Sequence, residues 1–383
     1  MGLLRFLLAM CVVSGHSSPI LGLPLLDAGL AVRTFFMISG FYMTLILTSK
    51  YHVKNGGYWL FISNRFLRIY PSYLVVLLVS TLFYAAASIK LHTPADRLAY
   101  WVDAIHHHRF LPMAGIAFSQ VSIFGIDSVA MFDYTPDKGF AWCGTLGDTA
   151  LRCWRFNFLP HCWSISVELF FYLAAPFLCV ARRWVQVGVA AFGLALYITA
   201  FQVLPHALAD AMTYHFFPFQ IGYLMLGVLS FHLLHPLFEK GHVHKVWSVV
   251  VLVPLGITIL FYGWLPWQLS TTVCIGFGFF AVPLLFNLTR RLAIDRFIGD
   301  LSYPMYLSHI TCKWLLLALM GVSKKDTAIV SGTQLLVVTV VVSVGLLWIV
   351  DYPVDRWRQA RVARMLGTQI PKAAPEHAPE TAA

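Results

Sequence analysis

Long runs of apolar residues recur along the chain, each close to twenty residues and separated by shorter polar stretches. A helix of about twenty apolar residues crosses the hydrocarbon core of a bilayer. The pattern therefore predicts an all-α polytopic membrane protein with about ten transmembrane helices. The predicted spans are residues 3–22, 29–48, 71–90, 163–181, 184–204, 215–235, 246–262, 269–288, 301–320 and 328–350.

Basic residues between these spans predict the orientation. Lys and Arg collect in cytoplasmic loops, and the basic loops of this chain fall on that side if both the N- and C-termini are cytoplasmic. Their residues are Lys50, Lys54, Arg65, Arg68, Arg182, Arg183, Lys240, Lys245, Arg290, Arg291, Arg296, Arg356, Arg358, Arg361 and Arg364. Lys324 and Lys325 fall on the opposite side and are an exception.

The longest connection, residues 91–161, is then extracytoplasmic. Its moderately apolar stretch 110–131 is interrupted by Gln120, Ser122 and Asp127, and a full span there would place Arg182 and Arg183 on the outside. We expect a re-entrant or interfacial element that covers a cavity, because irregular backbone at membrane depth needs protein or water around it.

Composition supports the membrane class. The chain is 59% hydrophobic and 11% charged, with a mean hydropathy of +0.73, which is too little charge for a soluble protein of this length. The net charge of +10 follows from the basic loops and does not indicate nucleic-acid binding. Cys143, Cys153 and Cys162 lie in the extracytoplasmic segment and can form one disulfide, whose pairing the sequence leaves open. Residues 356–383 are expected to form a basic and then disordered tail.

Two ionisable residues stand in the first span, where such groups are usually paired or functional. Arg5 and His16 are eleven residues apart. On a helix their side chains point within about 20° of each other and lie roughly 16 Å apart along the axis. Arg5 then lies near the cytoplasmic face and His16 in the outer half. A topological anchor and a satisfied interior histidine are the alternative interpretation.

The second and third spans carry three more arginines of interest. Arg33 stands near the outer end of the second span, whereas Ser39 and Gly40 fit a helix-packing face. Arg65 and Arg68 share one helical face at the cytoplasmic mouth of the third span. Guanidinium groups match phosphate geometry, so this pair can bind an anion, or it can simply follow the positive-inside rule.

The fourth span contains Glu168 at a depth similar to that of His16. A carboxylate that holds an imidazole in one tautomer is a frequent general-base arrangement. Ser164, Ser166 and Tyr172 on the same span can donate hydrogen bonds or pack against other helices.

In the ninth span His309 is either a core histidine or part of the same interior pathway. The consecutive residues His106, His107 and His108 do not share a helical face, so we expect a solvated loop and no metal site. The sequence shows no Ser-His-Asp spacing, Walker loop or dinucleotide fingerprint.

Five sequence elements, in order, resemble the acyltransferase 3 family of integral membrane O-acyltransferases. Arg5 and His16 match its Arg-x10-His. The other elements are FFMISGF (35–41), RFLRIYP (65–71), WSISVELFFYLAAP (163–176) and LSYPMYLSH (301–309), and the resemblance covers roughly residues 1–355. The chain departs from the family at Arg33, where many members are acidic, and at DYPVDRW (351–357).

The resemblance implies an acyltransferase acting on groups other than aminoacyl groups, in the bacterial inner (plasma) membrane. An acyl group, usually acetyl, would pass from cytoplasmic acyl-CoA to a sugar hydroxyl of a surface polysaccharide or glycolipid, an O-acetylation in polysaccharide biosynthesis. His16 would be the base, oriented by Glu168, and Arg5, Arg65 and Arg68 would bind the donor. Acyl-CoA is a co-substrate, and no bound cofactor is expected.

Two other classes remain open at this stage. A glycolipid or polysaccharide transporter or flippase would use the same buried charges as a substrate pathway. A proton-coupled carrier fits His16 and Glu168 but leaves the arginine pair unexplained. The sequence does not decide the acceptor, the acyl chain length, direct transfer against a covalent carrier, or the oligomeric state.

Overall fold

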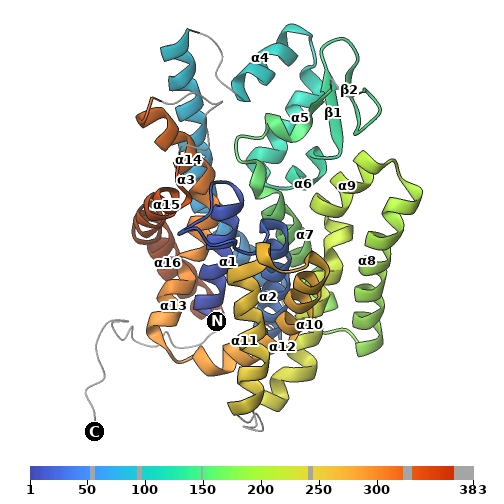
Figure 1. The fold of residues 1–383 in the computed structure, drawn as a ribbon, viewed down its shortest axis with the longest axis vertical. Coiled ribbons are helices and arrows are strands. Elements are labelled where there is room, and N and C mark those ends of the chain that lie inside the picture. The colour runs from blue at the N-terminus through green and yellow to red at the C-terminus, as the bar shows by residue number, and fades with distance from the viewer. Residues whose placement is uncertain (52–56, 93–96, 148–149, 240–244, 322–329, 366–383) are drawn as a thin grey trace.

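The computed structural model describes residues 1–51, 57–92, 97–147, 150–239, 245–321 and 330–365. The predicted disorder of the C-terminal tail therefore lies outside the described residues. The α-helices are α1 (Gly2–Gly15), α2 (Ala28–Ser49), α3 (Tyr58–Leu91), α4 (Arg97–His106), α5 (Phe110–Ser122), α6 (Ile126–Val129), α7 (Trp163–Leu178), α8 (Arg183–Val203), α9 (His206–His215), α10 (Phe217–Glu239), α11 (Lys245–Phe261), α12 (Trp267–Thr289), α13 (Ala293–Asp300), α14 (Ser302–Leu319), α15 (Gly332–Leu346) and α16 (Tyr352–Met365) (Figure 1).

A helix occupies each predicted span, and seven helical segments of the described chain are long and apolar enough to cross a membrane. These segments are Ala28–Ser49, Tyr58–Lys90, Pro160–Leu178, Arg183–Val203, His206–Glu239, Gln268–Thr289 and Gly332–Met365. The first predicted span is shorter than expected, because α1 ends at Gly15 and leaves His16 as its C-terminal capping residue. The structure thus shows a multi-pass helical membrane protein, while the count of ten spans stays a prediction.

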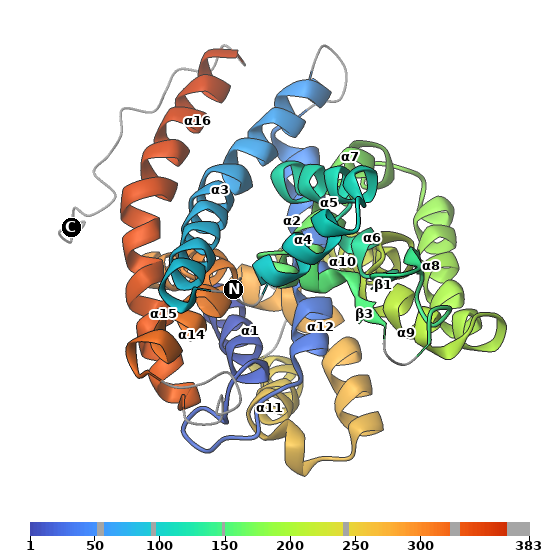
Figure 2. The same cartoon turned by 90° about the horizontal axis from the view of Figure 1, so that it is seen from above.

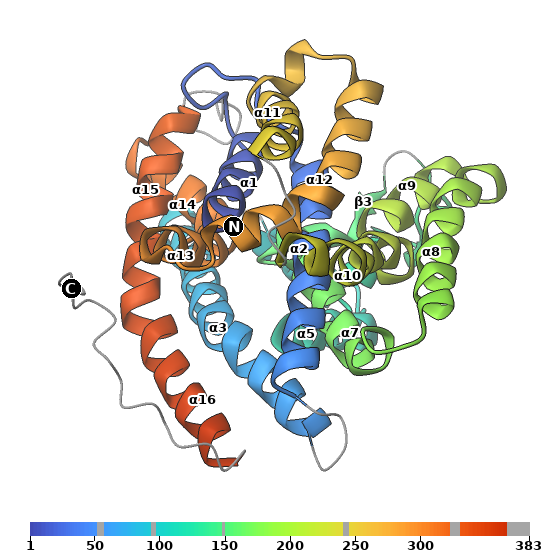
Figure 3. The ribbon, with the colours of Figure 1, turned by 90° about the horizontal axis from the view of Figure 1, so that it is seen from below.

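The helices form one bundle with α1, α2 and α10 between two flanks. Viewed from above and from below, α3, α15 and α16 lie on one flank and α8 and α9 on the other (Figures 2 and 3). Gly40 of α2 and Gly227 of α10 bring two helices together so closely that a Cβ at either would overlap the other backbone. This contact confirms the packing face predicted at Gly40.

A π-helical turn joins α15 to α16 (Leu347–Asp351). Its Asp351 accepts a hydrogen bond from Ser72 of α3. Such insertions bend a helix and redirect its side chains. The turn therefore ties the last helical segment to the start of the third span.

Residues 97–147 and 150–162 form a cap over one end of the bundle (Figure 1). The cap combines α4, α5 and α6 with an antiparallel sheet in the order β2-β1-β3 and two 3₁₀ turns. The strands are β1 (Phe132–Thr135), β2 (Gly139–Trp142) and β3 (Leu151–Arg152), and the turns are η2 (Cys153–Phe156) and η3 (Pro160–Cys162). The helix α5 has 13 residues and is too short to cross a bilayer.

The sheet is a feature that the sequence pattern did not predict. The cap has an apolar cluster of its own, in which Tyr134, Phe156 and Ile116 pack together. Cys143, Cys153 and Cys162 are buried and unpaired, so the disulfide allowed by the sequence is not formed in this structure.

A buried carboxylate connects the cap to the bundle. Asp127 accepts hydrogen bonds from Ser166 Oγ of α7 at 2.7 Å and from the amide of Phe217 at the start of α10 at 3.3 Å. Ser166 in turn accepts a bond from the amide of Gly125 at 3.0 Å. Burial raises the pKa of Asp127, and the two donated bonds act against that rise.

Candidate active site

A cavity of about 400 Å³ lies inside the bundle, between α1, α2, α3, α7, α13 and α14. This volume is in the range of small-molecule sites. Its lining is rich in arginine: Arg5, Arg65, Arg68, Arg290 and Arg296 all contribute. We call it the arginine cavity. Three carboxylates, Glu168, Asp295 and Asp300, also line it.

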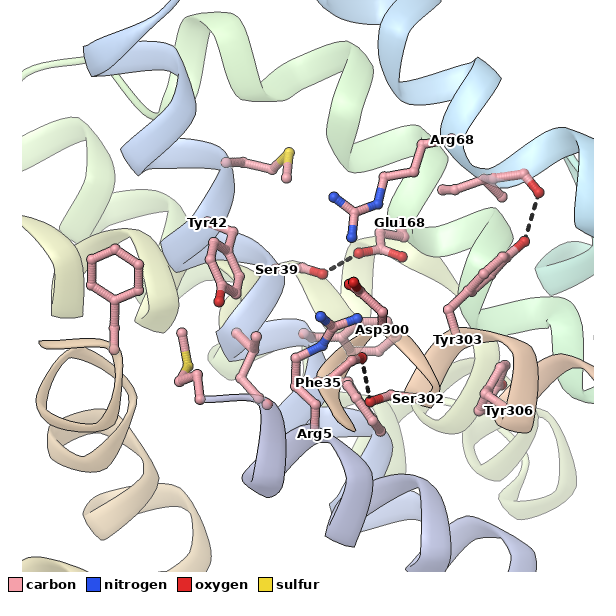
Figure 4. Close-up of a pocket in the computed structure, with 18 of the residues that line it drawn as sticks. Arg5, Phe35, Ser39, Tyr42, Arg68, Glu168, Asp300, Ser302, Tyr303 and Tyr306 are labelled. Atoms are coloured by element: carbon pink, nitrogen blue, oxygen red, sulfur yellow. Dashed lines mark hydrogen bonds between the residues drawn. The ribbon is translucent and has the colours of Figure 1, made fainter. Parts of the chain in front are cut away.

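Two of the arginines converge from opposite sides. Arg5 reaches in from α1 and Arg68 from α3, with Glu168 and Asp300 between them (Figure 4). Arg65 is nearly buried, and its Nε has no hydrogen-bond partner among the described residues. Its guanidinium lies over the ring of Phe61, at 5.8 Å. An arginine cluster with donor capacity to spare suits an anionic ligand.

Glu168 is held by α2. Ser39 donates a hydrogen bond to Glu168 Oε1, and Tyr172 lies one helical turn further along α7 on the same lining. Ser39 therefore faces the cavity, in contrast to the packing role that its sequence context suggested. Glu168 partly balances the charge of Arg5, and Asp300 acts on both Arg5 and Arg68, which would otherwise repel each other.

Asp295 fixes the start of α1 at the rim of the cavity. It accepts hydrogen bonds from the amides of Gly2 at 2.7 Å and Leu3 at 2.9 Å. Burial alone would raise the pKa of this carboxyl, but the Met1 ammonium and these amides outweigh burial and lower the pKa. Asp295 also lies at the N-terminal end of α1, where a negative charge complements the dipole of that helix.

Tyr306 of α14 and Ser164 of α7 also line the cavity. Tyr306 donates its hydroxyl proton to the carbonyl of His161. Ser164 Oγ lies 2.6 Å from the Tyr306 oxygen, and since that phenol proton is already committed, Ser164 is the donor. Tyr306 therefore connects the cavity to the histidines beyond it.

Those histidines form a compact group, which we call the histidine cluster (His16, His161 and His309). The ring of His309 lies 5.1 Å from that of His16 and 4.7 Å from that of His161, between centroids. His161 also contacts the Tyr306 ring, at 5.4 Å. His16 is the exposed member, whereas His161 and His309 are buried.

The predicted site residues therefore divide into two groups. Arg5, Arg65, Arg68, Ser164, Glu168 and Tyr172 line the arginine cavity, whereas His16 and His309 belong to the histidine cluster. No contact among the described residues joins Glu168 to His16, although the sequence put them at similar depth.

Two predicted residues lie elsewhere. Arg33 donates to Tyr197 at 3.3 Å and lies over the rings of Tyr197 and Tyr223. Ser166 supports the cap through Asp127. The residues His106, His107 and His108 are exposed, and no group of metal-binding side chains occurs within the described part of the chain.

Sequence reasoning missed His161, Asp300, Tyr306 and Lys313. Asp300 and Tyr306 lie inside or beside the LSYPMYLSH stretch, so the recognised motif was the available signal. His161 precedes WSISVE by two residues and was treated as part of a loop. Lys313, one turn beyond His309, donates to the carbonyl of His16 at 2.7 Å.

A family model described as an acyltransferase domain matches residues 1–348 of the chain. The chain belongs to the acyltransferase 3 family. The match confirms the resemblance noted in the sequence and includes every residue of the arginine cavity and of the histidine cluster. A search of curated proteins and a search of solved structures each found no match.

Membership gives the two groups of residues a common context. The protein is a multi-pass membrane acyltransferase, so it must accommodate an acyl donor and an acceptor. The arginine cavity and the histidine cluster adjoin at Tyr306 and differ in chemistry.

Proposed function

We propose that the protein transfers an acyl group, most simply acetyl, from cytoplasmic acyl-CoA to a sugar hydroxyl of a surface polysaccharide or glycolipid, in the bacterial inner membrane. The observation that carries this proposal is the position of Tyr306. It lines the arginine cavity, and its ring lies 5.4 Å from that of His161 and 6.0 Å from that of His309, between centroids.

The donor belongs in the arginine cavity. Coenzyme A carries several phosphate charges at one end and the thioester at the other. Arg65, Arg68, Arg290 and Arg296 offer donors for the phosphates. The thioester would then reach the part of the cavity where the hydroxyls of Ser164 and Tyr306 lie 2.6 Å apart.

The acceptor belongs on the side of the histidine cluster. His16 is the exposed member, at the end of α1, and an approaching hydroxyl meets it first. In direct transfer His16 takes the hydroxyl proton while the oxygen attacks the thioester carbonyl carbon. The C–S bond breaks, and the proton passes from His16 to the CoA thiolate, so an ester and a free thiol result.

In this scheme Glu168 does not orient His16, although its predicted depth in the membrane suggested that role. It balances Arg5 within the cavity, and Ser39 fixes its position. We propose that it orders the donor-binding arginines and that another group orients His16.

The test is thiol release by purified protein in lipid nanodiscs, given acetyl-CoA and extracts of surface glycans. Acceptor-dependent CoA release, with a matching gain of one acetyl mass on a glycan, is the expected result. A transporter or flippase would bind a glycolipid but release no thiol, and that outcome would contradict the proposal.

A further inference from the structure

The histidine cluster contains two ring nitrogens for which the reaction scheme above has no use. His309 is fully buried and His161 is 5% exposed. The Nε2 of His309 and the Nδ1 of His161 have no hydrogen-bond partner among the described residues. Leaving such groups unpaired in a protein interior is costly, so each calls for an explanation.

Backbone carbonyls determine the tautomers of both rings. His309 Nδ1 lies 2.6 Å from the carbonyl oxygen of Tyr306, and His161 Nε2 lies 3.1 Å from that of Leu307. A carbonyl only accepts, so these two nitrogens carry the protons. In the neutral rings the two unpartnered nitrogens are therefore lone pairs, ready to accept a proton or a hydrogen bond.

Among the described residues, the charged groups that act on His16 and its histidine neighbours are basic. The charged or titratable groups that act on the cluster are Lys313, one turn beyond His309 on α14, and Arg97 of the cap. Within the described residues, no carboxylate contacts any of the three rings. The orienting partner of His16 thus has to be something other than Glu168 or another acid.

We propose that His309 is the positioning residue of the catalytic base: its Nε2 lone pair, which has no partner among the residues that the structure describes, accepts a hydrogen bond from the ring N–H of His16 during the reaction, since the two rings lie 5.1 Å apart between centroids. The inference rests on the proposed function and adds a residue role to it. The backbone carbonyl of Tyr306 fixes His309, and His309 fixes His16, so a carbonyl–imidazole–imidazole chain replaces the usual carboxylate.

The proton balance is simple. His16 donates one ring N–H to His309, which leaves its other nitrogen free to take the acceptor hydroxyl proton. The imidazolium that forms is stabilised because its N–H to His309 becomes a charge-assisted hydrogen bond. His309 keeps its own Nδ1 proton on the Tyr306 carbonyl throughout. His161 packs edge-on against His309 and holds that ring in place.

Two substitutions at one position separate this role from a structural one. His309→Asn keeps a donor near Nδ1 for the Tyr306 carbonyl but removes the acceptor at Nε2. His309→Gln places an amide oxygen near the position of Nε2 and gives up the Nδ1 donor. His215→Asn is the matched control, because His215 Nδ1 also bonds a carbonyl one turn back, that of Ala211 at 3.1 Å, outside the cavity and the cluster.

We expect His309→Asn to lower kcat about 10- to 100-fold, the size of one charge-assisted hydrogen bond, with the donor KM unchanged. The acid limb of its pH–rate profile should shift to lower pH, because protonated His16 loses its partner. His309→Gln should recover part of the rate and of the shift. Wild-type behaviour of His309→Asn together with loss in His309→Gln would overturn the proposal, since that is the pattern of a purely structural Nδ1 donor.

A spectroscopic measurement decides the matter independently of turnover. In ¹⁵N-histidine spectra, His16 should take up its proton at a lower pH in His309→Asn than in wild type and in His215→Asn. An identical titration in all three proteins would overturn the proposal.

If wild-type protein transfers no acyl group at all, the proposed function fails, but this titration still tests the contact between His16 and His309. If His309→Asn does not fold, the wild-type spectra suffice: the His309 Nε2 signal must respond when His16 is protonated, and an unresponsive signal overturns the proposal.

Discussion

The arginine cavity and the histidine cluster adjoin at Tyr306, yet their chemistry is opposite. The cavity gathers five arginines and three carboxylates around an open volume. In the cluster the His309 ring lies 5.1 Å from that of His16 and 4.7 Å from that of His161, and the charged neighbours Lys313 and Arg97 are both basic. A polyanionic donor needs fixed positive charge, whereas a base needs a lone pair that stays unprotonated.

The largest effect is expected from the cluster. His16→Gln keeps hydrogen bonding but cannot take up a proton, so transfer should fall about 10²- to 10⁴-fold. Steady-state CoA release by purified, correctly folded protein measures this. A well-expressed His16→Gln variant with near-normal transfer would remove His16 from the mechanism.

The next effect concerns the cavity. Arg65→Ala and Arg68→Ala should each cost about 1.5–3 kcal/mol, through a higher donor KM, because a charged hydrogen bond to phosphate is lost. Lysine at either position should restore only part of the donor affinity, because it keeps the positive charge but lacks the paired N–H donors of the guanidinium. Arg183→Ala is the matched control: Arg183 also follows the positive-inside pattern but does not line the cavity. Equal effects in all three alanine variants would mean that the arginines act only on topology.

A smaller effect is expected where the two regions meet. Tyr306→Phe leaves the His161 carbonyl and Ser164 without the phenol, which should lower kcat about 5- to 20-fold, as for one or two neutral hydrogen bonds. Donor binding should stay near wild type, because the arginines are untouched. A change in donor affinity larger than the change in kcat would place Tyr306 in donor binding instead.

The smallest effect concerns the cap, outside both regions. Burial raises the pKa of Asp127, so the folded protein holds that proton more tightly than the unfolded chain. This contribution to stability is complete below the ordinary Asp pKa of about 3.9 and is lost as pH rises through the folded value. Asp127→Asn should remove that pH dependence from the thermal midpoint in detergent, with transfer nearly unchanged. Identical pH dependence of the thermal midpoint in wild type and Asp127→Asn would contradict this prediction.

The sequence predicted much of the helical fold, for a physical reason. Membrane thickness fixes the length of a span, and the backbone hydrogen bonds of a helix are local, so apolar runs are informative. The sheet of the cap escaped prediction because its strands have four residues or fewer. Such strands are stabilised by pairing and burial that the local pattern does not contain.

The site could be predicted only in part. The sequence indicates how deep a residue lies in the bilayer, but not which neighbouring helix its side chain faces. Arg65 and Arg68 line the same cavity, as their spacing of three residues on one helical face predicts. Glu168 and His16 lie on different helices, and only the packing of α2 against α7 shows that Ser39 takes up the carboxylate. His161 needed the tertiary fold to reveal its two histidine neighbours.

Donor binding measured separately from transfer tests the central claim most directly. Equilibrium binding of labelled acetyl-CoA would be compared among wild type, Arg68→Ala and His16→Gln in nanodiscs, beside acyl transfer by the same samples. The division into two regions predicts that His16→Gln binds the donor like wild type but transfers almost nothing, whereas Arg68→Ala loses binding in proportion to transfer. Loss of donor binding in His16→Gln, or full binding by Arg68→Ala, would contradict it.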